Sequence, residues 1–71
     1  MSNDIRKRLR CYIKDKMFIQ AEIARRSNIT PQQLSAILRG KRKMDANELY
    51  RICEALGTTI DEITHYSSQR G

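Results

Sequence analysis

The sequence has few of the residues on which metal sites, disulfide frameworks and aromatic cores depend. It contains no Trp, one Phe, one His and two Cys, and Cys11 and Cys53 stand in no CxxC arrangement. A zinc site needs Cys and His clustered at short spacing, so we expect no metal and no other cofactor. Two isolated thiols are typical of a reduced, cytoplasmic chain. No apolar run approaches the roughly 20 residues of a membrane span, and no signal peptide is visible.

Acidic residues are scarce in one half of the chain. Residues 1–43 carry 12 bases and 3 acids, net +9, whereas residues 44–71 carry 2 bases and 5 acids, net −3. A small chain with one strongly basic half predicts a polyanionic partner, most often nucleic acid. The alternative is a charged surface that only keeps the chain soluble. The length of 71 residues predicts one domain, 1–71, with a frayed end at residues 67–71.

The spacing of the hydrophobic residues predicts five short helices. Because no segment alternates apolar and polar residues as a strand does, we expect an all-α fold. The first helix runs from a cap at Ser2 or Asn3 to about Lys16. Its apolar stripe is Ile5, Leu9, Tyr12 and Ile13, opposite a basic face of Arg6, Lys7, Arg10 and Lys14. The second helix runs from Gln20 to about Ser27, with Ile23 and Ala24 inward. Asn28 suits the sharp turn that follows, since Asn tolerates the left-handed conformation.

Three Thr or Asp residues predict the beginnings of the remaining helices. Thr30 and Gln33 form a capping box with Pro31 at the first helical position, and Gly40 ends this helix. The same kind of box, Asp45 with Glu48 and Thr59 with Glu62, begins the fourth and fifth helices, and Gly57 separates them. The inward stripes are Leu34, Ile37 and Leu38, then Leu49, Ile52, Cys53 and Leu56, then Ile60 and Ile63. Cys53 is expected to be a small buried hydrophobe rather than a nucleophile.

The third helix leaves a narrow polar face outward. Its members are Gln32, Gln33, Ser35 and Ala36, and a cation cluster follows directly: Arg39, Lys41, Arg42 and Lys43. Amide side chains beside small residues, next to clustered cations, suit the major groove of DNA.

Four segments in the right order carry a resemblance to a known family. They are residues 20–24 (QAEIA), 29–37 (ITPQQLSAI), 39–43 (RGKRK) and 54–63 (EALGTTIDEI). With this spacing, the chain resembles the lambda-repressor-like helix-turn-helix domains of the XRE/Cro-repressor family over roughly residues 5–66. The resemblance implies a five-helix bundle that binds DNA.

The resemblance also implies roles for individual residues. Those expected near bases are Gln32, Gln33, Ala36 and Pro31. Those expected at the DNA backbone are Gln20, Thr30, Ser35, Arg39, Lys41, Arg42 and Lys43. Gln32 has the clearest outward position, and Gln presents a donor and an acceptor together to adenine. Gln33 either reads a base or folds back onto the Thr30 amide. Arg25 and Arg26 are weaker candidates for phosphate contact than the cation cluster, because they fit a solvated helix face.

The chain departs from the family pattern in three respects, at four positions. The buried Arg–Glu pair that often joins the first and third helices is replaced by Ile13 and Leu38, which should preserve the contact. Asn28 stands where Gly is usual. Ile19 occupies a helix-start position that Ser, Thr or Asn normally holds, which costs about 1 kcal/mol.

The most consistent function is a transcriptional regulator, a repressor, that binds a palindromic operator in double-stranded DNA as a homodimer. The expected dimer contact is through the fourth and fifth helices, with Met44, Tyr50, Ile60, His65 and Tyr66 as candidates; alternatively these residues complete the core. The competing function is an antitoxin or antirepressor module whose main partner is a protein. RNA binding is disfavoured because the basic half offers no stacking aromatics. An enzyme is not expected, since no nucleophile–base pair or phosphate loop is present.

Overall fold

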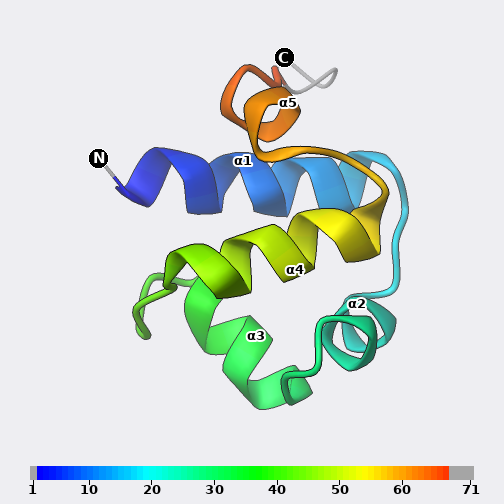
Figure 1. The fold of residues 1–71 in the computed structure, drawn as a ribbon, viewed down its shortest axis with the longest axis vertical. Helices are drawn as coiled ribbons and strands as arrows, with labels where there is room; N and C mark the ends of the chain where they lie inside the picture. Colours follow the sequence, from blue (N-terminus) through cyan, green and yellow to red (C-terminus); the bar gives the residue numbers. More distant parts are fainter. Residues whose placement is uncertain (1, 68–71) are drawn as a thin grey trace.

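The structure is a computed structural model that describes residues 2–67, and only the backbone at positions 2–4. Its helices are α1 (Ser2–Asp15), α2 (Gln20–Arg26), α3 (Pro31–Leu38), α4 (Ala46–Leu56) and α5 (Ile60–Thr64) (Figure 1). The all-α prediction is confirmed, and each predicted helix is present to within about a residue of its expected ends. The predicted side-chain cap at Ser2 or Asn3 lies outside this description, as does the predicted frayed end, residues 67–71, from residue 68 on. Within residues 2–67, no helix is long and apolar enough to cross a membrane.

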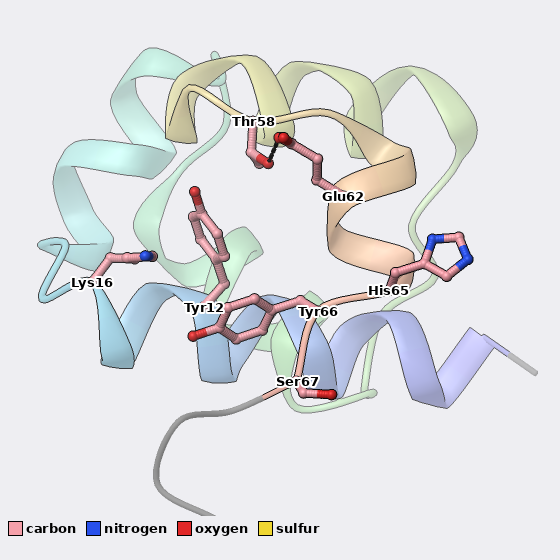
Figure 2. A pocket seen from close by; sticks show the side chains of 7 residues that line it. All are labelled: Tyr12, Lys16, Thr58, Glu62, His65, Tyr66 and Ser67. Carbon is pink, nitrogen blue, oxygen red and sulfur yellow. Dashed lines mark hydrogen bonds between the residues drawn. The ribbon is translucent and has the colours of Figure 1, made fainter.

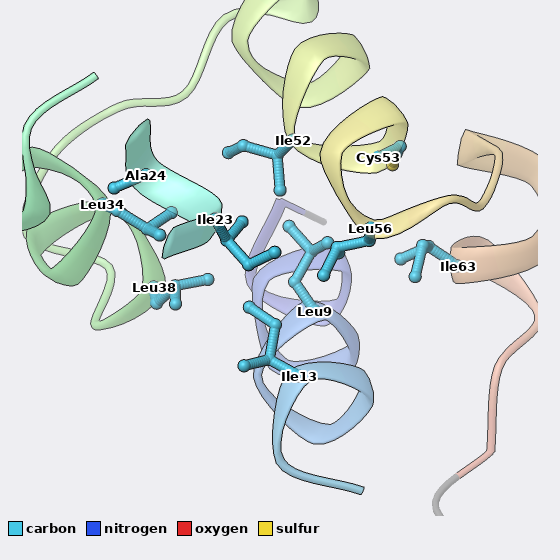
Figure 3. Packing of buried hydrophobic residues seen from close by; sticks show 10 residues of the cluster. All are labelled: Leu9, Ile13, Ile23, Ala24, Leu34, Leu38, Ile52, Cys53, Leu56 and Ile63. Atoms are coloured by element: carbon cyan, nitrogen blue, oxygen red, sulfur yellow. The ribbon is translucent and has the colours of Figure 1, made fainter. Parts of the chain in front are cut away.

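One apolar cluster receives side chains from all five helices. Leu9, Ile23, Leu34, Ile52 and Ile63, one from each helix, are each exposed by 1% or less (Figure 3). Ile13 and Leu38, which replace the family's ion pair, are both buried in this cluster. The predicted apolar contact between α1 and α3 is therefore confirmed, and α2 packs against both α3 and α4.

Four helices end in the same backbone arrangement. Met17, Asn28, Gly40 and Gly57 follow α1 to α4 with φ between 61° and 77°. After each, the next amide donates to a carbonyl five residues earlier, as in Lys41 N to Ala36 O at 2.9 Å and Thr58 N to Cys53 O at 2.9 Å. This is the Schellman motif, which gives the last carbonyls of a helix their donors. The turn at Asn28 and the stops at Gly40 and Gly57 were predicted, whereas the left-handed Met17 was not.

The predicted inward position of Ile60 is wrong. Ile60 is 37% exposed, whereas Ile63 is fully buried. Ile60 is the first residue of a helix of only five residues, so its side chain lies at the edge of the bundle, and Ile63 alone brings α5 into the core.

Tyr66, which follows α5, contacts α1 through its hydroxyl and its ring. Its hydroxyl donates to the Asp15 carboxylate at 2.7 Å, and its ring meets the Tyr12 ring edge-on at 5.1 Å. The hydrogen bond to Asp15 raises the pKa of Tyr66 to about 12. Figure 2 shows the two tyrosines side by side, with His65 pointing away from them. Met44 is half-buried against the core, as the alternative to a dimer contact requires, and Tyr66 is half-buried against α1.

Candidate nucleic-acid interface

The capping box at the start of α3 decides which of its two exposed glutamines is held by a hydrogen bond. Thr30 Oγ1 accepts from the Gln33 amide at 3.0 Å, and Gln33 Oε1 accepts from the Thr30 amide at 3.0 Å. Pro31 follows at the first helical position. The Gln33 carboxamide is therefore held in the cap through its oxygen, whereas no hydrogen bond among the described residues holds the Gln32 side chain.

The outward face of α3 is narrow because three of its eight residues belong to the core. Leu34, Ile37 and Leu38 are exposed by 3% or less. Ser35 and Ala36 are half-buried beside them, and Pro31, Gln32 and Gln33 are exposed. A face of two amides and small side chains lets the helix backbone approach a surface closely, as entry into a DNA groove requires.

The neighbouring helix brings Gln20 to its exposed first position. Ile19 precedes it in extended conformation with no side-chain cap, as predicted. At the other end, the buried Ser27 hydroxyl donates to the Ile23 carbonyl at 2.7 Å, and Asn28 makes the turn into α3. These features end α2 and turn the chain, and α2 packs directly on α3, which is the arrangement of a helix-turn-helix unit.

Three of the four predicted cations after α3 are exposed, and the fourth is half-buried in an ion pair. Arg39, Lys41 and Lys43 are exposed. Arg42 Nη1 instead lies 3.0 Å from Glu48 Oε2, with side-chain exposures of 38% and 10%. The other Glu48 oxygen accepts from the Asp45 amide at 3.1 Å. The sequence expectation grouped all four cations together, whereas the structure ties Arg42 to the start of α4.

The cations of α2 are paired with an acid of their own helix. Arg25 contacts Glu22, and Arg26 Nε lies 4.0 Å from the same carboxylate. The Arg25 hydrogen bond lowers the pKa of Glu22 below its ordinary value. Both arginines are exposed, as expected of a solvated helix face.

One arginine at the interface was missed by the sequence reasoning. Arg10 was assigned to the basic outer face of α1, yet its Nη1 donates to the Leu38 carbonyl at 2.7 Å. A cation at the end of a helix pairs with carbonyls that have no helical donor. No spacing rule signals a contact between residues 28 positions apart, so only the fold reveals it.

Chemistry outside this interface is sparse in the described part of the chain. No group of three His, Cys, Asp or Glu side chains gathers as a metal site there. Cys53 is buried in the core, and burial raises the pKa of its thiol to about 11, so it remains a neutral thiol at neutral pH. The prediction that Cys53 is a buried hydrophobe is confirmed.

Comparison with known proteins agrees with this geometry. A family model described as "Helix-turn-helix" matches residues 7–63, which include α2, the turn at Asn28 and α3. No curated protein matches the chain. No solved structure matches it either.

Proposed function

The chain belongs to the helix-turn-helix family, in its XRE and lambda-repressor-like branch, and we propose that it is a sequence-specific repressor that inserts α3 into the major groove of DNA. This family is one of DNA-binding domains rather than of enzymes, and the chain is a DNA-binding helix-turn-helix regulator. The observation that carries the proposal is the exposed Gln32 in the first turn of α3, with exposed cations at the other end of the same helix.

Gln32 is the main residue proposed to contact a base edge. A bidentate pair between its carboxamide and adenine N6 and N7 discriminates by about 1–3 kcal/mol. Pro31 and Ala36 offer apolar contact to a thymine methyl. Gln33 is secondary in this scheme, because its oxygen is held by Thr30.

Phosphate binding falls to residues around that helix. Gln20, Thr30 and Ser35 offer hydrogen bonds, and Arg39, Lys41 and Lys43 offer charge. If four to six phosphates are neutralised per subunit, the logarithm of the binding constant falls with the logarithm of salt by about 0.9 per phosphate. These contacts supply affinity and register, whereas Gln32 supplies sequence choice.

The active form in this proposal is a homodimer on a palindromic operator. One α3 reads only a few base pairs, and two copies about 34 Å apart meet successive major grooves. Tyr50 and Ile60, exposed by 55% and 37%, are the apolar side chains of α4 and α5 most open to a second copy. Sedimentation that shows a monomer both alone and on a palindromic duplex would rule the dimer out.

In vitro selection of bound duplexes at a stated salt concentration tests the proposal. We expect a palindromic consensus with an adenine opposite each Gln32. Enrichment of no duplex sequence would contradict sequence-specific binding and would favour a module whose main partner is a protein, such as a toxin or an antirepressor.

A further inference from the structure

A basic hollow opens where α1 meets the end of α3. Its volume is about 450 Å³, and its lining consists of Arg6, Lys7, Arg10, Leu38, Arg39 and Gly40. Four of these six residues are cations and none is an acid. Figure 1 places the beginning of α1 and the end of α3 on the same side of the molecule. We call this feature the α1 hollow.

Arg10, one of the residues that line the α1 hollow, connects its two sides. Its guanidinium holds the carbonyl of Leu38, the last residue of α3, at 2.7 Å. This hydrogen bond joins the basic face of α1 to the helix that faces DNA. The position of Lys7, one turn earlier on α1, is therefore set relative to the exposed face of α3.

Arg39 connects the α1 hollow to the DNA-facing row. It follows Gln32 by seven residues, nearly two helical turns, so both lie on one face about 10 Å apart along the axis. When a duplex binds against Gln32 and Ala36, its phosphate backbone consequently lies near Arg39. Lys7, which is exposed, lies on the other side of the same hollow.

We propose that the α1 hollow binds a phosphate of the DNA backbone, with Lys7 and Arg39 as the binding cations and Arg10 as a positioning residue. This inference rests on the proposed DNA-binding function and adds α1 to the surface that the duplex contacts. An acidic protein segment has the same charge, but the alignment of Arg39 with Gln32 favours the backbone of the duplex that α3 reads.

Neutral phosphates provide the test. Single methylphosphonate substitutions are placed along the selected duplex, and the affinities of wild type and Lys7→Gln are compared at one salt concentration. We expect one position per half-site at which the methylphosphonate lowers the DNA affinity of wild type severalfold but does not change the DNA affinity of Lys7→Gln. Lys7→Arg restores the sensitivity. The matched control is Lys14→Gln, an exposed cation seven residues further along α1 that does not line the hollow; it keeps the wild-type pattern.

The outcomes separate this inference from the function on which it rests. If wild type binds the selected duplex and Lys7→Gln keeps every sensitive position, the α1 hollow holds no phosphate, although the repressor proposal stands. If wild type selects no duplex, the proposed function fails and this inference fails with it. If Lys7→Gln weakens binding to poly-L-glutamate but not to DNA, the occupant is an acidic polypeptide instead.

Discussion

Gln32 and Gln33 are adjacent and chemically identical, yet their hydrogen bonds separate them. Both are exposed, but Gln33 completes the capping box with Thr30, whereas no hydrogen bond within residues 2–67 holds the Gln32 side chain. We predict that Gln33→Ala lowers the free energy of unfolding by about 0.5–1.5 kcal/mol. Gln32→Ala should leave stability unchanged and relax base choice at one position per half-site. Thermal denaturation and repeated in vitro selection measure the two effects, and a reversed pattern would contradict the assignment.

Arg42 and Lys41 are adjacent cations with different surroundings. Arg42 pairs with the nearly buried Glu48, while Lys41 is exposed. We predict that Arg42→Met lowers the free energy of unfolding by about 1 kcal/mol, because the Glu48 carboxylate loses its partner. The salt slope of DNA binding should stay at the wild-type value. Lys41→Met should instead reduce that slope by about 0.9 and leave stability unchanged. Equal loss of slope in both variants would show that Arg42 binds phosphate.

Cys53 gives the stability of the protein a pH dependence. Its pKa in the folded chain is raised from 9.0 to about 11 by burial. Between these values the unfolded chain has lost the proton that the folded chain retains, so stability falls as pH rises. The fall is up to about 1.4 kcal/mol per pH unit and is absent below pH 9.

Urea denaturation between pH 8 and pH 10 measures this dependence. Cys53→Ala should be less stable at pH 8 but flatter across the range. Cys11→Ala, which leaves the buried thiol in place, should keep the wild-type slope. A wild-type slope in Cys53→Ala would assign the pH dependence to other groups.

At the scale of the helix, local sequence signals were sufficient for most boundaries. The three capping boxes at Thr30, Asp45 and Thr59 each have both of their hydrogen bonds. Gly40 and Gly57 mark their helix ends because glycine adopts positive φ without a steric cost. Met17 was not predicted because a Met carries no signal for a left-handed residue; at this helix end the Phe18 amide donates to the Ile13 carbonyl and Phe18 packs against the core.

The uncapped start of α2 offers a direct test of this local reasoning. Ile19 is 71% exposed and gives no side-chain hydrogen bond to the helix. We predict that Ile19→Ser stabilises the protein by about 1 kcal/mol, since serine caps the first free amides and little apolar burial is lost. For a chain of this size, the melting temperature should rise by about 4–8 °C. Ile19→Ala is the matched control, and an equal rise in that variant would exclude capping as the cause.

At the scale of the whole molecule, the sequence could predict the charge asymmetry but not where the fold places each charge. The +9 of residues 1–43 includes cations that the structure commits to other contacts, among them Arg25 to Glu22, Arg42 to Glu48 and Arg10 to the end of α3. Each of these contacts depends on the direction of a side chain or on packing between residues that are far apart in the sequence. Gln32 and Lys41, by contrast, are exposed where the helical pattern placed them.

The whole chain is also proposed to unfold as one domain. All five helices contribute to a single apolar cluster, so loss of one helix should expose the others. Coincident transitions by circular dichroism and by tyrosine fluorescence are the expected result. Separate transitions would divide the chain into independent parts.

In the proposed function, the exposed face of α3 and the cations after it form the surface that contacts DNA. We propose to titrate ¹⁵N-labelled protein with the selected duplex and to follow the backbone amides by NMR. The largest chemical-shift changes should fall on Gln32, Ala36 and the amides of residues 39–43, with small changes at Glu62 and His65 on α5 and just beyond it. Shifts confined to α4 and α5, with α3 unchanged, would contradict this proposal.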